Sequence, residues 1–263
     1  MAKKLGITII PITVLFSTEV YRDGVDLTTE QFYDKLVRTK IFPTTAVPPL
    51  GDFVKIYDKL AEETNEILVV TVSSKLSGIY EAARQAVELM KKKCRVEVID
   101  SQFVVMAEGL IVITAAKAAQ EGASLDRLID LTRRNISRAN ARFAFDTLEY
   151  LKRGGRIGKA TAFLGSLLRV HPVLTVRGGE VHPVKQERSR AKAIDNLYNF
   201  IMSFSHIDEL AVEDATTPEE ADRLADRLGS KFPRERIYRT KVSPTIGAHV
   251  GPHVIGVSVL GER

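Results

Sequence analysis

Residues 73–78, Ser-Ser-Lys-Leu-Ser-Gly, combine residue types that bind anions. They directly follow residues 66–72, an apolar run rich in β-branched residues that predicts a strand buried on both faces. A predicted helix comes next, and helix N-termini beyond the ends of parallel strands offer free N–H groups and a partial positive charge. The segment therefore predicts a carboxylate or phosphate site whose candidate ligands are Ser73, Ser74, Ser77 and Gly78. Alternatively, Ser77 only caps the helix. The high frequency of serine at helix starts favours this interpretation.

A second segment, residues 43–49, holds two hydroxyls between prolines in the order Pro-Thr-Thr-Ala-Val-Pro-Pro. Because proline fixes much of the backbone, Thr44 and Thr45 are candidate ligands held in place. Alternatively, this is a rigid loop whose threonines satisfy local backbone groups. Arg156 and His249 belong to glycine-rich loops, from which a side chain can reach an anion, face solvent or support the structure.

The sequence offers no credible catalytic machinery. No serine lies in a G-x-S-x-G turn, and the S-x-x-K match at residues 189–192 lacks its S-D-N and K-T-G companions. Residues 154–159 look like a phosphate loop, but Ala160 stands where Mg²⁺ binding needs Ser or Thr. A Gly-Pro sequence between His249 and His253 prevents them from sharing a helix face as metal ligands. We therefore expect no resident metal and no cofactor.

Composition limits the class of protein. The 263 residues are 44% apolar and 27% charged, as in ordinary globular proteins. The net charge of +5 is spread over 38 basic and 33 acidic residues without an aromatic platform, which disfavours nucleic-acid binding. One cysteine, Cys94, excludes internal disulfides. Pro11 interrupts the only signal-like stretch, and no apolar run is long enough to span a bilayer, so we expect a soluble cytoplasmic protein.

Strand-like and helix-like segments alternate, which predicts an α/β fold. A turn-rich, basic junction at residues 151–156 suggests two α/β domains, residues 1–150 and 151–263. The first is expected to be a mostly parallel sheet covered by helices. Its predicted strands are 7–16, 66–72 and 96–99, and its predicted helices are 28–40, 50–60, 79–92, 105–120 and 125–138. The second is predicted to contain a hairpin over 173–184 turning at Gly178-Gly179, helices 190–204 and 218–228, and strands 209–212, 236–242 and 254–260.

Six segments, in order along the chain, form a recognisable set. They are Tyr21-Arg22-Asp23-Gly24-Val25-Asp26, Pro43-Thr44-Thr45, Ser73-Ser74-Lys75-Leu76-Ser77-Gly78, Ile99-Asp100-Ser101, Leu148-Glu149-Tyr150-Leu151-Lys152-Arg153-Gly154-Gly155-Arg156-Ile157 and His249-Val250-Gly251-Pro252. Together they resemble the DegV family. The resemblance covers nearly the whole chain, and the serine-rich and Leu-Lys-Arg-Gly-Gly-Arg-Ile segments are the specific ones.

This resemblance implies two α/β domains with a fatty acid in a tunnel between them. The acyl carboxylate would be held by Thr45 and Ser74, with His249 and Arg156 close to that polar end. The resemblance also implies a non-catalytic role as the acyl-binding subunit of fatty acid kinase, presenting the carboxylate to a separate ATP-dependent subunit. Two other hypotheses remain. One is an enzyme acting on a small carboxylated or phosphorylated metabolite, and the other is a docking protein that uses the basic residues Lys152, Arg153, Arg156, Arg188 and Arg190.

The sequence departs from the family pattern in four places. It lacks the usual N-terminal strand with an Asp-Ser motif, which predicts that a neighbouring strand has an unpaired edge. The segment after Thr44 is Thr45-Ala46-Val47-Pro48-Pro49 in place of Thr-Ser-Gln-Pro-Ser. Ile79 replaces a threonine, and His253 replaces a glycine.

Overall fold

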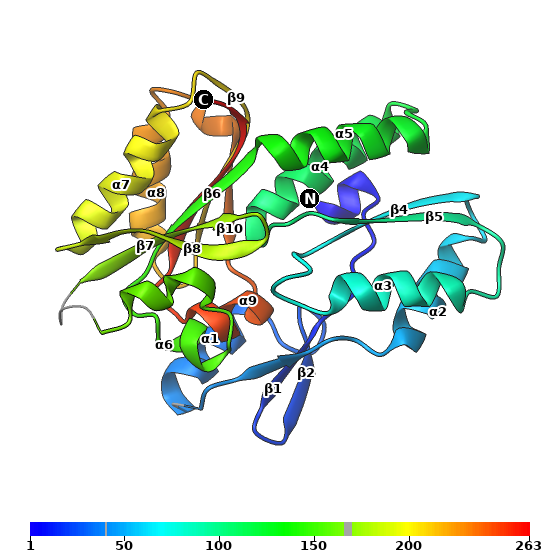
Figure 1. Cartoon of the computed structure of the whole chain (residues 1–263), viewed down its shortest axis with the longest axis horizontal. Coiled ribbons are helices and arrows are strands. Elements are labelled where there is room, and N and C mark those ends of the chain that lie inside the picture. The colour runs from blue at the N-terminus through cyan, green and yellow to red at the C-terminus, as the bar shows by residue number, and fades with distance from the viewer. Residues whose placement is uncertain (40, 166–169) are drawn as a thin grey trace.

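Two helix-covered sheets and one small antiparallel sheet make up the chain (Figure 1). The computed structural model describes residues 1–39, 41–165 and 170–263. The α/β class predicted from the sequence is confirmed. Among the described residues, no helix combines the length and the apolar character that crossing a bilayer requires.

The first helix-covered sheet has two parallel strands, β4 (Glu66–Thr71) and β5 (Arg95–Asp100). Helices α2 (Leu50–Leu60) and α3 (Ile79–Glu88) pack on one face, where Tyr57 and Ala83 are buried. Helix α5 (Leu125–Arg138) packs through Ile129 against Ile99 of β5. In the described part of the chain, each of these strands has a strand partner on one side only.

A three-stranded antiparallel sheet, absent from the sequence-based prediction, lies beside it. Its order is β2-β1-β3, with β1 (Thr13–Phe16), β2 (Glu19–Arg22) and β3 (Thr44–Ala46). The strand expected over residues 7–16 is therefore shorter. It follows a 3₁₀ turn, η1 (Ala2–Leu5), which ends at Gly6 with φ 67°. The segment predicted as a rigid threonine loop instead contains β3, which pairs with β1.

The larger sheet has six strands in the order β10-β9-β11-β6-β7-β8. They are β6 (Ala139–Ala144), β7 (His171–Arg177), β8 (Glu180–Glu187), β9 (His206–Asp214), β10 (Ile237–Lys241) and β11 (Ile255–Glu262). Strands β9 and β10 are parallel neighbours, and the other pairs that the structure describes in this sheet are antiparallel. The sheet spans the domain division drawn from the sequence, because β6 precedes residue 150 and pairs with two later strands. The division itself stays a prediction.

Helices cover both faces of this sheet. Helices α7 (Arg190–Met202) and α8 (Pro218–Leu228) bury Leu197 and Leu224 in one core cluster with Val257 of β11. Helix α4 (Val105–Gln120) contributes Leu110 and Ile111 to the other cluster. These two clusters and the helices of the first sheet account for most of the buried apolar side chains.

Helix α9 (Pro244–Val250) connects the C-terminal half to the N-terminal half. It packs against α1 (Thr29–Thr39), β1 and β3. The Tyr33 hydroxyl donates to the carbonyl of Val242 at 3.0 Å. A Cβ at Gly247 would lie 2.6 Å from Cε1 of Phe32, so only glycine lets the helices approach this closely. This packing brings the end of α9 to β3.

Most predicted elements match the observed ones within a few residues, including the hairpin of β7 and β8. The predicted helix end at Lys40 lies outside the described residues. Strand β6 and helices α6 (Glu149–Arg153), α9 and η2 (Gly158–Phe163) were not predicted. Strand β6 has the sequence Ala-Asn-Ala-Arg-Phe-Ala, whose alanines and asparagine are poor strand formers, so its neighbours in the sheet decide its conformation. A further short 3₁₀ turn, η3 (Arg234–Arg236), precedes β10.

Candidate functional site

A direct hydrogen bond joins two of the predicted site residues that are 204 positions apart. Oγ1 of Thr45 lies 2.9 Å from Nε2 of His249, and the contact is partly buried. Thr45 is held in the ladder opposite Val14 of β1, and His249 lies in the last turn of α9. Pairing of β3 with β1 and packing of α9 on both strands therefore position the two side chains.

His249 is neutral at physiological pH. Burial, and next the positive charge of Arg156, lower its pKa to about 4. Nδ1 of its ring is buried without a hydrogen-bond partner among the described residues. It faces Gly154, where a Cβ would come within 2.3 Å of Nδ1. Position 154 therefore needs glycine for the imidazole to fit.

The surroundings of Nδ1 indicate which ring nitrogen carries the proton. A buried N–H without an acceptor is costlier than a buried lone pair without a donor. We therefore assign the proton to Nε2, which donates to Oγ1 of Thr45. In this arrangement the Thr45 hydroxyl proton is free to be donated to a third group. The Thr45 hydroxyl is thus a hydrogen-bond donor whose orientation is fixed by the neutral His249.

Arg156 places a positive charge beside this pair. Its Nε donates to the carbonyl of Leu76 at 3.0 Å, and its Nη1 donates to the carbonyl of Gly154 at 2.7 Å. It forms no ion pair with a carboxylate in residues 1–39, 41–165 and 170–263, unlike most arginines that are similarly shielded. The guanidinium therefore connects the serine-rich segment with the junction after α6, and its charge, which no carboxylate of the described residues compensates, acts on His249 of α9.

The serine-rich segment directs its first two hydroxyls to groups of the protein. Ser73 is buried, and its hydroxyl donates to the carbonyl of Gly179 at 2.7 Å. The exposed Ser74 donates its hydroxyl to Oδ2 of Asp100 at 2.6 Å and its N–H to Oδ1 at 3.2 Å. Among the described residues, no hydrogen bond joins Ser74 to Thr45 or His249. Its assignment to a ligand stays a prediction, and it would require exchange of the Asp100 bond.

The remaining candidates lie on the same two segments. Gly78, not Ser77, is the N-cap of α3, and α3 receives no side-chain cap bond, so the capping alternative for Ser77 is wrong. A Cβ at Gly78 would lie 3.6 Å from Cγ2 of Val47, so the two segments are in contact. Thr44 is exposed on β3. The structure thus brings Thr45, His249 and Arg156 together. The other predicted ligands lie at neighbouring positions of the segments that contain Thr45 and Ser74.

Apolar side chains border the polar cluster of Thr45, His249 and Arg156. The Tyr150 ring packs closely on Gly251, where a Cβ would lie 2.5 Å from Cδ2 of the ring, and Phe42 lies 4.9 Å from Tyr150 between ring centroids. Leu76 and Val250 are only partly buried. The cluster therefore combines hydrogen-bond donors and a positive charge with adjacent apolar surface.

Two participants, Asp100 and Gly154, were not selected from the sequence as site residues, although both lie in segments that carry the family resemblance. A further carboxyl, Glu108, is coupled to Asp100 by charge alone. Burial, and next the charge of Asp100, raise the pKa of Glu108 to about 8, so its carboxyl is protonated at neutral pH. These contacts become visible only in the tertiary structure. Among the described residues, no cluster of three or more His, Cys, Asp or Glu side chains could hold a metal ion.

Comparison with known proteins gives consistent matches over the whole chain. A family model described as "Uncharacterised protein, DegV family" matches residues 1–262. A DegV domain-containing protein of Clostridium perfringens is 33% identical over 268 residues, covering 100% of this chain and 94% of that protein. A DegV family protein from Thermus thermophilus, whose solved structure is described as fatty acid binding, superposes with a TM-score of 0.90 at 31% identity, covering 99% and 94% of the two chains. DegV from Bacillus subtilis, described as a fatty acid binding protein, gives a TM-score of 0.90 at 29% identity, covering 100% and 94%.

Proposed function

The chain belongs to the DegV family, and from this membership we propose that it binds a long-chain fatty acid without transforming it. The two solved relatives of similar fold and 29–31% identity are described as fatty acid binding, which supports the proposal. The carboxylate would lie at the polar cluster of Thr45, His249 and Arg156. The acyl tail would follow the apolar surface beside it.

The contact between Thr45 and the neutral His249, next to an uncompensated Arg156, carries this proposal. The Thr45 hydroxyl would donate to one carboxylate oxygen, and the Arg156 charge would favour the ionised acid. Each buried methylene of the tail contributes about 0.8 kcal/mol, so apolar contact dominates the affinity and the polar cluster sets the orientation.

Ser74 is the second proposed carboxylate ligand. Its hydroxyl has one proton, which it donates to Asp100. Donation to an acyl carboxylate would therefore replace one charged acceptor by another, with a smaller net gain than at Thr45. We propose Thr45 as the principal hydroxyl and Ser74 as an additional one.

Presentation of the carboxylate to a separate kinase subunit is a further part of the proposal. Among the basic residues considered for docking, Lys152, Arg153 and Arg188 are exposed, and Arg153 pairs with Glu149 one helical turn away. Arg190 is not available, because its guanidinium pairs with Glu220 at 2.8 Å and Asp146 at 3.3 Å. The docking surface would therefore rely on the other basic residues.

An enzymatic role on a small metabolite is disfavoured by the same site. That hypothesis needs a general base near Ser74, and His249 was the available candidate. With its pKa lowered to about 4, His249 is a poor base for chemistry at neutral pH.

Mass spectrometry of the protein purified from a bacterial host tests the proposal. We expect close to one fatty acid per chain in the native spectrum and in the lipid extract. Fatty acid added back after organic extraction should raise the melting temperature, because the ligand binds only the folded state. Absence of any near-stoichiometric acyl species, together with no thermal shift on addition, would contradict the proposal.

A further inference from the structure

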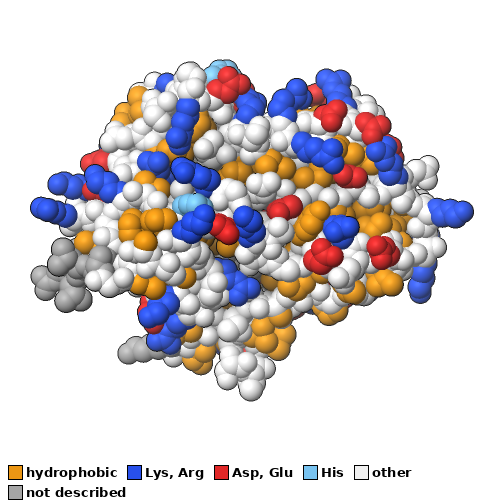
Figure 2. All heavy atoms as spheres, viewed as in Figure 1, with side chains coloured by type: hydrophobic (Ala, Val, Ile, Leu, Met, Phe, Trp, Pro, Cys, Tyr) orange, Lys and Arg blue, Asp and Glu red, His pale blue; other side chains and the backbone are white. Residues whose placement is uncertain are grey.

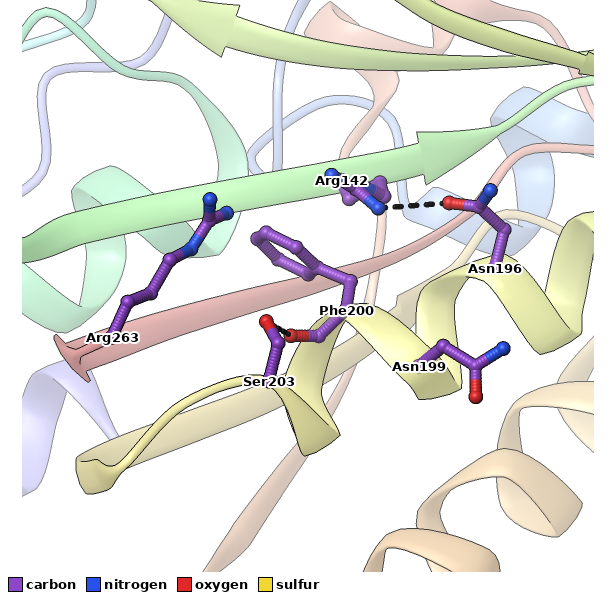
Figure 3. Close-up of a pocket in the computed structure, with 6 residues that line it drawn as sticks. All are labelled: Arg142, Asn196, Asn199, Phe200, Ser203 and Arg263. Atoms are coloured by element: carbon purple, nitrogen blue, oxygen red, sulfur yellow. Dashed lines mark hydrogen bonds between the residues drawn. The ribbon is translucent and has the colours of Figure 1, made fainter.

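Two surface pockets away from the Thr45–His249 contact share a pair of arginines, Arg142 and Arg263. The smaller, of about 220 Å³, lies between the large sheet and α7 and is shown in Figure 3. Its lining residues are Arg142, Asn196, Asn199, Phe200, Ser203 and Arg263. The larger, of about 480 Å³, adds Arg177 and His182. Neither pocket has an Asp or Glu among its lining residues.

The two guanidinium groups are held against one aromatic side chain. The guanidinium carbon of Arg142 lies 4.1 Å from the centroid of the Phe200 ring, and that of Arg263 lies 4.9 Å from it. Figure 3 shows both side chains directed toward this ring, with Arg142 bonded to the Asn196 carboxamide. Ring stacking of this kind fixes the planes of the guanidinium groups without using their N–H donors.

The charge of this arginine pair is uncompensated. Nη1 of Arg142 donates to Oδ1 of Asn196 at 2.9 Å, while its Nε is buried without a partner among the residues that the structure describes. Neither Arg142 nor Arg263 forms an ion pair with a carboxylate of the described residues. Burial, and next the positive charge of Arg263, lower the pKa of Arg142 to about 10. The surroundings of Arg142 therefore disfavour its positive charge.

Three other shielded arginines, on helices α5 and α7 and on strand β10, show the contrast. Arg138 pairs with Asp208, and Arg239 pairs with Asp214 at 3.0 Å. Arg190 pairs with Glu220 at 2.8 Å. Apart from Arg156 at the proposed acyl site, the other partly buried arginines among the described residues have a carboxylate partner, so the Arg142–Arg263 pair stands out as a second place that lacks one. Figure 2 shows further Lys and Arg side chains gathered on the face where β7 and β8 lie in Figure 1.

We propose that Arg142 and Arg263 bind the phosphate group of a small phosphorylated molecule, whose remaining part lies in the larger pocket beside Arg177 and His182. A phosphate monoester carries close to two negative charges at neutral pH, which match the charges of two guanidinium groups. A carboxylate would neutralise only one of the two positive charges. The Asn196 carboxamide orients Arg142. This site is separate from the proposed acyl site, because none of its lining residues belongs to the cluster of Thr45, His249 and Arg156.

Isothermal titration of the whole chain with inorganic phosphate and glycerol 3-phosphate, and with acetate as the carboxylate control, tests the site. We expect saturable binding of both phosphate probes and at least tenfold weaker binding of acetate. Arg142→Gln and Arg263→Gln should each weaken phosphate binding about tenfold or more, since each removes a charged donor. Arg127→Gln is the matched control. It removes one positive charge from an exposed position on α5, where the side chain forms no hydrogen bond, ion pair or ring contact with the described residues, and should leave the affinity unchanged.

Several results would overturn the proposal. One is the absence of saturable phosphate binding, and another is an affinity for acetate equal to that for phosphate. A third is a loss of phosphate affinity in Arg127→Gln as large as in the two site variants, which would indicate a general charge effect. If Arg142→Gln does not fold, the exposed Arg263→Gln decides alone. Fatty acid affinity should be unchanged in Arg263→Gln, so failure of the acyl proposal and failure of this one remain distinguishable.

Discussion

Replacing Thr45 by valine removes the hydroxyl that joins His249 to the proposed carboxylate and keeps the shape of the side chain. In the parent protein, the 2.9 Å contact leaves the Thr45 proton free for the ligand. Losing one hydrogen bond to a charged group costs about 1.5–3 kcal/mol, which corresponds to a Kd about ten to a hundred times higher. The same change leaves Nε2–H of His249 without an acceptor. That cost affects the free and the bound protein alike, so it lowers stability and largely cancels in the affinity.

Thr45→Ser is the matched control, because it retains the hydroxyl and loses only a methyl group. Its affinity should stay close to that of the parent protein. Ser74→Ala should weaken binding in the same direction but less, because Ser74 already donates to Asp100 before the ligand arrives. In the double variant Thr45→Val/Ser74→Ala, the losses should not add, since both hydroxyls would contact one carboxylate.

Isothermal titration, or displacement of a fluorescent acyl probe, on the parent and the four variants measures these differences. Chemical denaturation of the ligand-free proteins separates the stability effect from the affinity effect. An unchanged Kd in both Thr45→Val and Ser74→Ala would refute the assignment of the carboxylate, even if the fatty acid itself is found. A loss in Thr45→Ser as large as in Thr45→Val would show that packing, not the hydroxyl, controls affinity.

Two further predictions concern groups outside this contact. Ser73→Ala should lower the unfolding free energy by about 1–3 kcal/mol in denaturant titration, because the buried bond to Gly179 is lost; a change in fatty acid affinity without a change in stability would contradict this. Burial raises the pKa of Glu213 to about 7, against the opposing hydrogen bonds from Ser258 and Met106. The stability that the protonated Glu213 carboxyl contributes is therefore full below about pH 4.5 and is lost as the pH rises through about 7. The unfolding free energy of the parent protein should fall between pH 5 and pH 8 for this reason. Glu213→Gln, which cannot ionise, should make that fall smaller by up to about 3 kcal/mol. Identical pH profiles for the parent and this variant would show that Glu213 does not cause that fall.

Local signals in the sequence were sufficient for most of the fold. Residues 28–31, Thr-Thr-Glu-Gln, form a capping box at the start of the helix predicted over residues 28–40. The Thr28 N–H donates to Oε1 of Gln31 at 2.9 Å, and the Gln31 N–H donates to Oγ1 of Thr28 at 3.2 Å. Gly178 and Gly179 both have positive φ, as the predicted tight turn requires. These features depend on residues a few positions apart, so the sequence contains the whole interaction.

The partners of the site residues were decided only in the tertiary structure. The family resemblance selected Thr45, Ser74, Arg156 and His249, but it did not reveal that Ser74 donates to Asp100. Nor did any local pattern predict β6. The contact between Thr45 and His249 exists because β3 pairs with β1 and because Gly247 allows α9 to approach α1. Periodicity and turn chemistry report only neighbours along the chain. The neighbours of a side chain across 204 residues depend on how sheets and helices pack, which no local segment determines.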